Sequence, residues 1–185
     1  GSPEKPCRVI VGAKKILDID HLNFWLKPDK LTVINYDIEN QLYHAFILVV
    51  DPNRTWRPGI VPDYANYAPA YIGPEIPGHI AKDENVTVYY FRGGPTRNWW
   101  KLNTDYGYYQ EHTPDWAPVA GKYETIKTDA DCASTLSCLK NAMATVEAMD
   151  IIYLGASPNS NTTVAYALRA CGLPVFERGG PEYGR

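Results

Sequence analysis

The sequence lacks two features that mark common classes of protein. It has no excess of basic residues, because 18 Lys and Arg stand against 21 Asp and Glu, a formal net charge of −3. Nonspecific nucleic-acid binding needs a basic face that contacts phosphates, so we expect no nucleic-acid partner. The chain also has no apolar run near the roughly 18 residues that span a bilayer, so we predict no transmembrane segment.

Patterns for phosphate and metal binding are missing as well. Gly93-Gly94 and Gly179-Gly180 lack the strand, turn and helix that surround a phosphate-binding glycine loop. The four cysteines form no C-x-x-C pair, and the four histidines are scattered, so no zinc pattern is present. We therefore expect neither a metal nor a cofactor.

The chain is of a length typical of one domain. It has 185 residues, of which 45% are hydrophobic, enough for a buried core. No internal repeat or low-complexity tract divides it. We predict a single domain over residues 1–185, interpret Gly1-Ser2-Pro3 as the remnant of a cleaved tag, and expect no signal peptide.

The cysteines Cys7, Cys132, Cys138 and Cys171 are even in number and allow two disulfides with three connectivities. We favour a local bridge between Cys132 and Cys138, which leaves Cys7 to pair with Cys171. Disulfides persist in oxidising compartments, so this interpretation predicts a secreted or exported protein. Reduced cysteines in the core are the alternative.

Strands are expected in the first half of the chain, and helices at its end. β-Branched and aromatic runs predict strands over residues 31–36, 42–50 and 85–92, the last ended by Gly93-Gly94-Pro95. Residues 8–19 fit a short strand or a helix, and residues 151–154 fit a short strand or an extended link. Helices are predicted over residues 131–149, with Asp131 as the cap, and 160–171, ended by Gly172. Strands followed by helices predict an α+β fold, an antiparallel sheet packed against C-terminal helices.

Long aromatic segments without periodicity connect these elements. Residues 54–77 are rich in Pro, Gly and Tyr, and residues 96–123 in aromatic residues, and a loop as long as the first in a compact domain is usually functional. The rings either pin the loops to the core or line a cleft.

The start of the last helix carries the clearest chemical signal. Pro158 and Asn159 precede Ser160, Asn161 and Thr162. A small polar residue at a helix start usually caps it, which explains one of these side chains but not the whole run. Alternatively, Ser160 is a nucleophile at the positive end of the helix dipole, and it then needs a base. His44, in the apolar strand YHAFILVV, is the candidate base, although a histidine there is also an ordinary core residue.

A histidine strand followed far downstream by Asn-Cys-Asn-Thr at a helix start resembles the circularly permuted papain-like hydrolases and acyltransferases, which include cell-wall amidases and the lecithin:retinol acyltransferase group. His44 matches the histidine strand, and the run from Asn159 to Val164 matches the nucleophile helix. Ser160 stands where that family has cysteine. The resemblance covers about residues 42–173, through two short motifs.

The resemblance implies a permuted papain-like fold and a hydrolase or acyltransferase that acts on an amide or ester in a cell-wall peptide or a lipid. It also implies a toxin or effector domain, for which a protein partner such as an immunity or carrier protein is expected. A third polar residue should orient His44, and His79 or Asn85 is the expected one. The expected substrate contacts are Asn159, Asn161, Tyr43, Trp56, Trp99 and Trp100.

Two alternatives to an active hydrolase follow from the serine. An unaided serine hydroxyl is a weaker nucleophile than a thiolate, so Ser160 would depend on His44 as general base. In one alternative, catalysis is lost and the chain is a binding module that contacts its partner through aromatic loops. These loops carry Trp56, Tyr64, Tyr67, Tyr71, Trp99 and Trp100. In the other alternative, Ser160 and Asn161 only cap the helix and the resemblance is architectural.

Overall fold

The structure is a computed structural model. It describes residues 3–15, 43–53, 57, 59–60, 86–95, 101–109, 113, 115–116, 122–152 and 160–175. Among these residues, no helix is long and apolar enough to cross a membrane.

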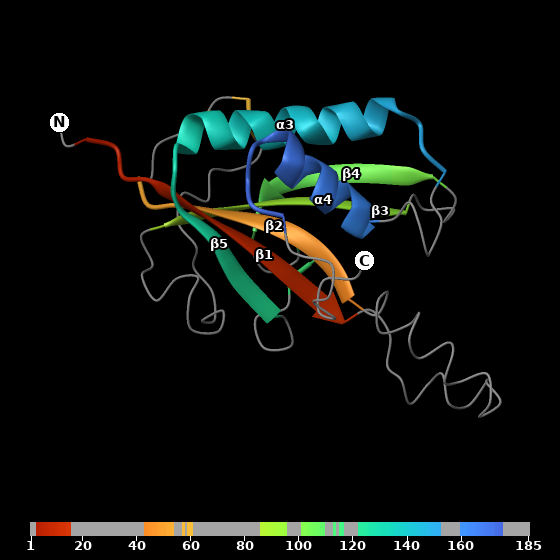
Figure 1. Cartoon of the computed structure of the whole chain (residues 1–185), viewed down its shortest axis with the longest axis horizontal. Coiled ribbons are helices and arrows are strands. Elements are labelled where there is room, and N and C mark those ends of the chain that lie inside the picture. Colours follow the sequence, from red (N-terminus) through yellow and green to blue (C-terminus); the bar gives the residue numbers. More distant parts are fainter. Residues whose placement is uncertain are drawn as a thin grey trace.

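Five strands form one antiparallel sheet, in the order β4-β3-β2-β1-β5 (Figure 1). The first three in the chain come from its apolar runs, and β2 occupies the centre of the sheet. The strands are β1 (Cys7–Lys15), β2 (Tyr43–Asp51), β3 (Thr87–Pro95), β4 (Leu102–Tyr108) and β5 (Lys122–Ala130).

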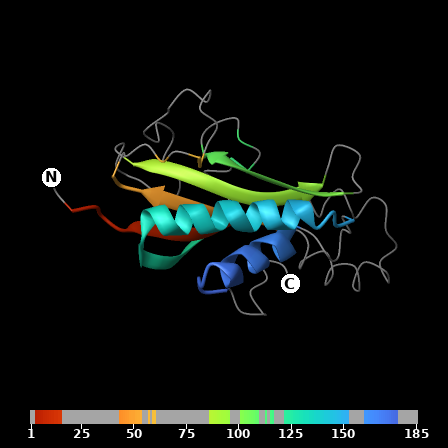
Figure 2. The ribbon, with the colours of Figure 1, turned by 90° about the horizontal axis from the view of Figure 1, so that it is seen from above.

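The two helices of the described residues lie on the same face of this sheet (Figures 1 and 2), which divides the core in two. Helices α3 (Cys132–Ala148) and α4 (Ser160–Ala170) pack on the face that carries Ala45, Ile47 and Val49 of β2. The opposite face carries Phe46, Leu48 and Val50 of the same strand, together with aromatic side chains such as Tyr109 and Tyr123. Side chains alternate between the faces of a strand, so His44 belongs with the second face.

The predicted α+β class and both helices are confirmed. Asp131 caps α3 as expected, because its carboxylate accepts a hydrogen bond from the backbone N–H of Ser134 at 2.9 Å. Gly172 follows α4 with a φ of +64°, the left-handed conformation that ends a helix.

Two expectations for the strands were wrong. Gly93-Gly94-Pro95 does not end β3 but continues it, because β4 pairs with β3 as far as Pro95. The segment expected to be irregular, residues 96–123, contains β4 and the start of β5. The interval 151–154 is described only at its start, where Ile152 forms a single bridge to Lys101. The predicted strand over residues 31–36 lies outside the described residues.

Two disulfides are present, but the pairing differs from the expected one. Cys7 pairs with Cys132 and Cys138 with Cys171, with Cα atoms 5.1 and 5.7 Å apart, respectively. The local bridge fails because both Cys132 and Cys138 lie in α3, where six residues advance about 9 Å along the axis. A disulfide joins Cα atoms at most about 7 Å apart. One bridge therefore ties β1 to α3, and the other ties α3 to the residue that follows α4.

Candidate functional site

Three polar residues meet on the sheet face opposite the helices. His44 of β2 and Arg92 of β3 both contact the carboxylate of Asp115, which lies in a turn beyond β4. Nε2 of His44 is 3.0 Å from Oδ1 of Asp115, and Nε of Arg92 is 2.7 Å from Oδ2. The side chain of Asp115 is 3% exposed, so a single buried carboxylate is held between an imidazole and a guanidinium.

Both contacts have the distance of an ion pair without the angles of a directed hydrogen bond. Hydrogen bonds at catalytic sites are often poorly aligned before substrate binds. We therefore treat His44, Arg92 and Asp115 as one group because of the distances between their atoms. A buried carboxylate needs a counter-charge, and Arg92 supplies it here.

Aromatic side chains fix the turn that carries Asp115. The hydroxyl of Tyr109 donates to the backbone oxygen of Asp115 at 2.8 Å and lies 2.9 Å from the hydroxyl of Tyr123. The ring of Phe46 stacks between those of His44 and Tyr109, with centroid distances of 6.2 and 5.9 Å. Burial raises the pKa of Tyr123 to about 12, so this hydroxyl stays protonated at neutral pH and can donate.

The first turn of α4 lies where the pairing of β2 with β3 stops. The last paired residues are Ile47 and Phe91. Beyond them, the backbone N–H of Ala45 donates to Oδ1 of Asn161 at 2.7 Å. On β3, Gly93 has no side chain, which leaves room for Thr163. A Cβ added to residue 93 would lie only 2.6 Å from Oγ1 of Thr163. The start of α4 is thus fixed to both strands, next to the strand position of His44.

The structure describes only some of the residues predicted for the site. Ser160 begins α4 and directly precedes Asn161, which is buried, but the described part of the chain does not include the Ser160 side chain. The same holds for the side chain of Tyr43 at the start of β2. The other predicted residues lie outside the described residues: His79, Asn85, Asn159, Trp56, Trp99 and Trp100.

Sequence reasoning missed Asp115 and Arg92. The partner of His44 was expected beside the next strand, at His79 or Asn85, whereas Asp115 comes from the turn after β4. No local pattern marks that aspartate. Arg92 carried a weak signal, because it is a charged residue in an otherwise apolar strand and has to face a counter-charge.

A histidine held by a buried carboxylate can accept a proton from a hydroxyl and return it to a leaving group. The carboxylate orients the imidazole and stabilises its protonated form. Comparisons with protein-family models, with curated proteins and with solved structures found no match for this chain. The candidate site therefore depends on its own geometry.

Proposed function

We propose that the chain is a hydrolase or acyltransferase of amide or ester bonds, built on the permuted papain-like plan. In this proposal Ser160 is the nucleophile, His44 is the general base, and Asp115 orients His44. One observation carries the proposal. His44 is held by a buried carboxylate, and the N–H of the next residue, Ala45, is held by the residue that follows Ser160.

The proton path follows from the two nitrogens of the imidazole. Nε2 of His44 contacts Asp115, so Nδ1 is the nitrogen that takes the proton of the Ser160 hydroxyl. The oxygen of Ser160 then attacks the carbonyl carbon, and His44 returns the proton to the leaving amine or alcohol. The backbone N–H groups at the start of α4 stabilise the negative charge that develops.

The interruption of the β2–β3 pairing makes this geometry feasible. His44 faces away from the helices, whereas α4 packs on the helix face. Oδ1 of Asn161 accepts from the backbone N–H of Ala45 beyond the last β2–β3 pair, so α4 begins beside the end of β2 that carries His44.

Two disulfides also support work in an oxidising compartment, and we propose that the protein is secreted or exported. The substrate classes proposed from the family resemblance are cell-wall peptides and lipid acyl esters, in keeping with a toxin or effector domain.

Labelling with a fluorophosphonate probe tests the nucleophile. The wild type and Ser137→Ala, which changes a serine on the exposed side of α3, should label at the same rate. Ser160→Ala should not label, and His44→Gln should label about 10²-fold to 10⁴-fold more slowly. A wild-type protein that stays unlabelled, or a Ser160→Ala variant that labels like the wild type, contradicts the proposal.

Hydrolysis assays then separate the substrate classes. Release of amines from cell-wall peptides and release of fatty acid from lipid vesicles are measured with the wild type and with Ser160→Ala. Activity that depends on Ser160 should appear with one of the two substrates. If the folded wild type labels but hydrolyses neither, the serine is nucleophilic and the proposed substrate classes are wrong.

A further inference from the structure

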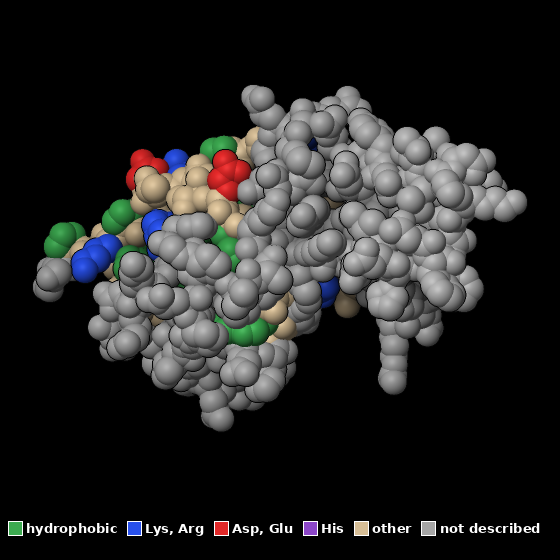
Figure 3. All heavy atoms as spheres, turned by 90° about the horizontal axis from the view of Figure 1, so that it is seen from below, with side chains coloured by type: hydrophobic (Ala, Val, Ile, Leu, Met, Phe, Trp, Pro, Cys, Tyr) green, Lys and Arg blue, Asp and Glu red, His purple; other side chains and the backbone are tan. Residues whose placement is uncertain are grey.

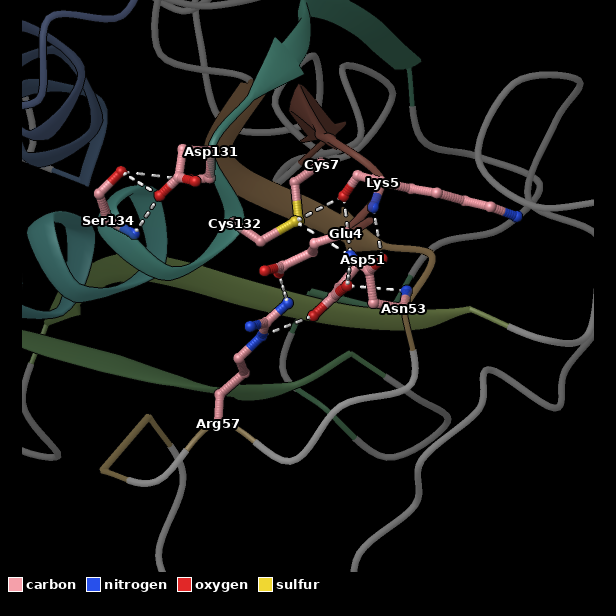
Figure 4. A network of polar contacts seen from close by, with 9 residues as sticks. All are labelled: Glu4, Lys5, Cys7, Asp51, Asn53, Arg57, Asp131, Cys132 and Ser134. Atoms are coloured by element: carbon pink, nitrogen blue, oxygen red, sulfur yellow. Dashed lines mark hydrogen bonds and ion pairs between the residues drawn. A yellow bond between two sulfur atoms is a disulfide. The ribbon is translucent and has the colours of Figure 1, made fainter. Parts of the chain in front are cut away.

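A second buried carboxylate lies at the far end of β2. Asp51 is fully buried, and its Oδ1 accepts hydrogen bonds from the backbone N–H and from Nδ2 of Asn53, both at 2.9 Å (Figure 4). Its Oδ2 contacts Nε of Arg57 at 3.0 Å. A carboxylate oxygen can accept at two positions, so Oδ2 can take one more contact.

The N-terminal segment closes over this carboxylate. The backbone N–H of Lys5 donates to Oδ1 of Asn53 at 2.7 Å, and Nδ2 of Asn53 donates to the backbone oxygen of Lys5 at 2.8 Å. Glu4 pairs with Arg57. Figure 3 shows the molecule from below, with described acidic and basic side chains toward the end where the chain begins. This segment is therefore held in place by side-chain contacts in addition to the disulfide.

Two sulfur atoms adjoin the same carboxylate. Sγ of Cys7, Sγ of Cys132 and an oxygen of Asp51 all lie within 4.8 Å of one another, and all three residues are buried. Tetrahedral zinc has bonds of about 2.3 Å to sulfur and 2.0–2.2 Å to oxygen, which puts its ligand atoms about 3.5–3.8 Å apart. A disulfide holds its sulfur atoms about 2.05 Å apart, so after reduction the two sulfur atoms would have to separate by about 1.7 Å to surround one ion together with the Asp51 oxygen.

We propose that Cys7, Cys132 and Asp51 bind one soft or borderline divalent cation, of which Zn²⁺ is the type, when the disulfide between the cysteines is reduced. Two molecules of a thiol reductant break the S–S bond: two protein thiols form, and the reductant leaves as its own disulfide. The cation then displaces the two thiol protons and binds the thiolates and a carboxylate oxygen of Asp51.

The surroundings favour this exchange. Cys132 is the first residue of α3, where the positive end of the helix stabilises a thiolate. Arg57 pairs with both Asp51 and Glu4, so one positive charge already faces two carboxylates. Reduction and ionisation of the cysteines add negative charge next to Asp51, which the cation would neutralise. The ion would link the same elements as the disulfide, so β1 and α3 would stay joined in reducing and in oxidising surroundings. The cysteine spacing in the sequence did not indicate this site, because Cys7 and Cys132 are 125 positions apart.

The test uses the full chain in two matched variants. Cys138→Ser with Cys171→Ser keeps the proposed ligands, and Cys7→Ser with Cys132→Ser keeps the other pair. Each protein is reduced with dithiothreitol, desalted without oxygen and titrated with Co²⁺. The first variant should show thiolate-to-cobalt absorption that saturates at one ion per chain and disappears when Zn²⁺ is added. The second should show none. Asp51→Asn in the first variant should weaken Zn²⁺ binding on the order of 10-fold or more.

Circular dichroism of each sample reports whether it is folded. The proposal is overturned if the first variant is folded after reduction and gives no such absorption. It is equally overturned if that variant unfolds on reduction and Zn²⁺ does not restore the fold, or if both variants absorb alike.

Discussion

The carboxylate of Asp115 lies 3.0 Å from Nε2 of His44, on the sheet face away from both helices. Asp115 contacts the imidazole from a turn rather than from a neighbouring strand. Arg92 holds the other carboxylate oxygen at 2.7 Å, so the three side chains form one charged unit in the interior. Stability and the proposed chemistry both depend on this unit.

The first prediction concerns the coupling between Arg92 and Asp115. Arg92→Met leaves a carboxylate that is 3% exposed without its cation and should lower the free energy of unfolding by about 3 kcal/mol. Asp115→Asn should cost less, because the side chain of Arg92 is 22% exposed and reaches water. Urea denaturation of the single and double variants measures both effects.

The double variant provides the control for this interpretation. With both charges gone, neither charge is left buried without its counter-charge, so the loss in the double variant should be smaller than the sum of the single losses by about 0.5–3 kcal/mol. Strictly additive losses would mean that the two side chains do not interact in solution.

The helices and the central strand could be predicted from the sequence because their signals are local. Asp131 caps α3 through a residue three positions away, and Gly172 ends α4 by its own conformation. By contrast, β4 has the sequence LNTDYGY, and only the residues at its two ends are buried. It is a strand because β3 pairs with it and because Thr104 contacts α3 through the backbone oxygen of Met143. The sequence of a single segment does not show which other segments it will contact in the fold.

The site shows the same limit. His44 stood out as a polar residue in an apolar strand, and Asn161 as part of a polar run at a helix start. Asp115 lies in a turn without periodicity, and only the folded chain brings it to His44. The predicted disulfide pairing was wrong for a related reason. Closeness in sequence suggested a bridge between Cys132 and Cys138, but six residues of a helix advance about 9 Å, too far for a disulfide.

The second prediction tests how α4 lies against β3. A Cβ on residue 93 would lie 2.6 Å from Oγ1 and 2.8 Å from Cβ of Thr163, too close for either. Gly93→Ala should therefore lower the free energy of unfolding by about 1–3 kcal/mol. Gly107→Ala in β4 is the matched control, because its Cβ would lie 3.4 Å from the nearest atom, and it should change stability by less than about 0.5 kcal/mol. Equal losses in the two variants would refute the close contact.

The third prediction concerns the two disulfides. Peptides from a digest without reductant should link Cys7 to Cys132 and Cys138 to Cys171. The bridges close loops of 125 and 33 residues, and loop-closure entropy then gives about 5 and about 4 kcal/mol of stabilisation. Replacing the first pair with serine should thus lower stability more than replacing the second, as measured by thermal unfolding without metal. A peptide linking Cys132 to Cys138 would contradict the pairing.

The fourth prediction concerns the acid dependence of the cap on α3. Hydrogen bonds from the side chain and the backbone N–H of Ser134 lower the pKa of Asp131 from its ordinary value of 3.8. The folded state then binds this proton less readily than the unfolded state, so the cap stabilises the fold above pH 3.8 and loses its effect as the pH falls through the lowered pKa. Asp131→Ala should be less stable than the wild type near pH 7, and the difference should narrow near about pH 2. Asp129→Ala, which removes an exposed carboxylate that pairs with Lys127 at 3.3 Å, should show little difference at either pH. Urea unfolding at the two pH values measures both variants, and a difference for Asp131→Ala that does not narrow in acid would mean that its carboxylate charge does not stabilise α3.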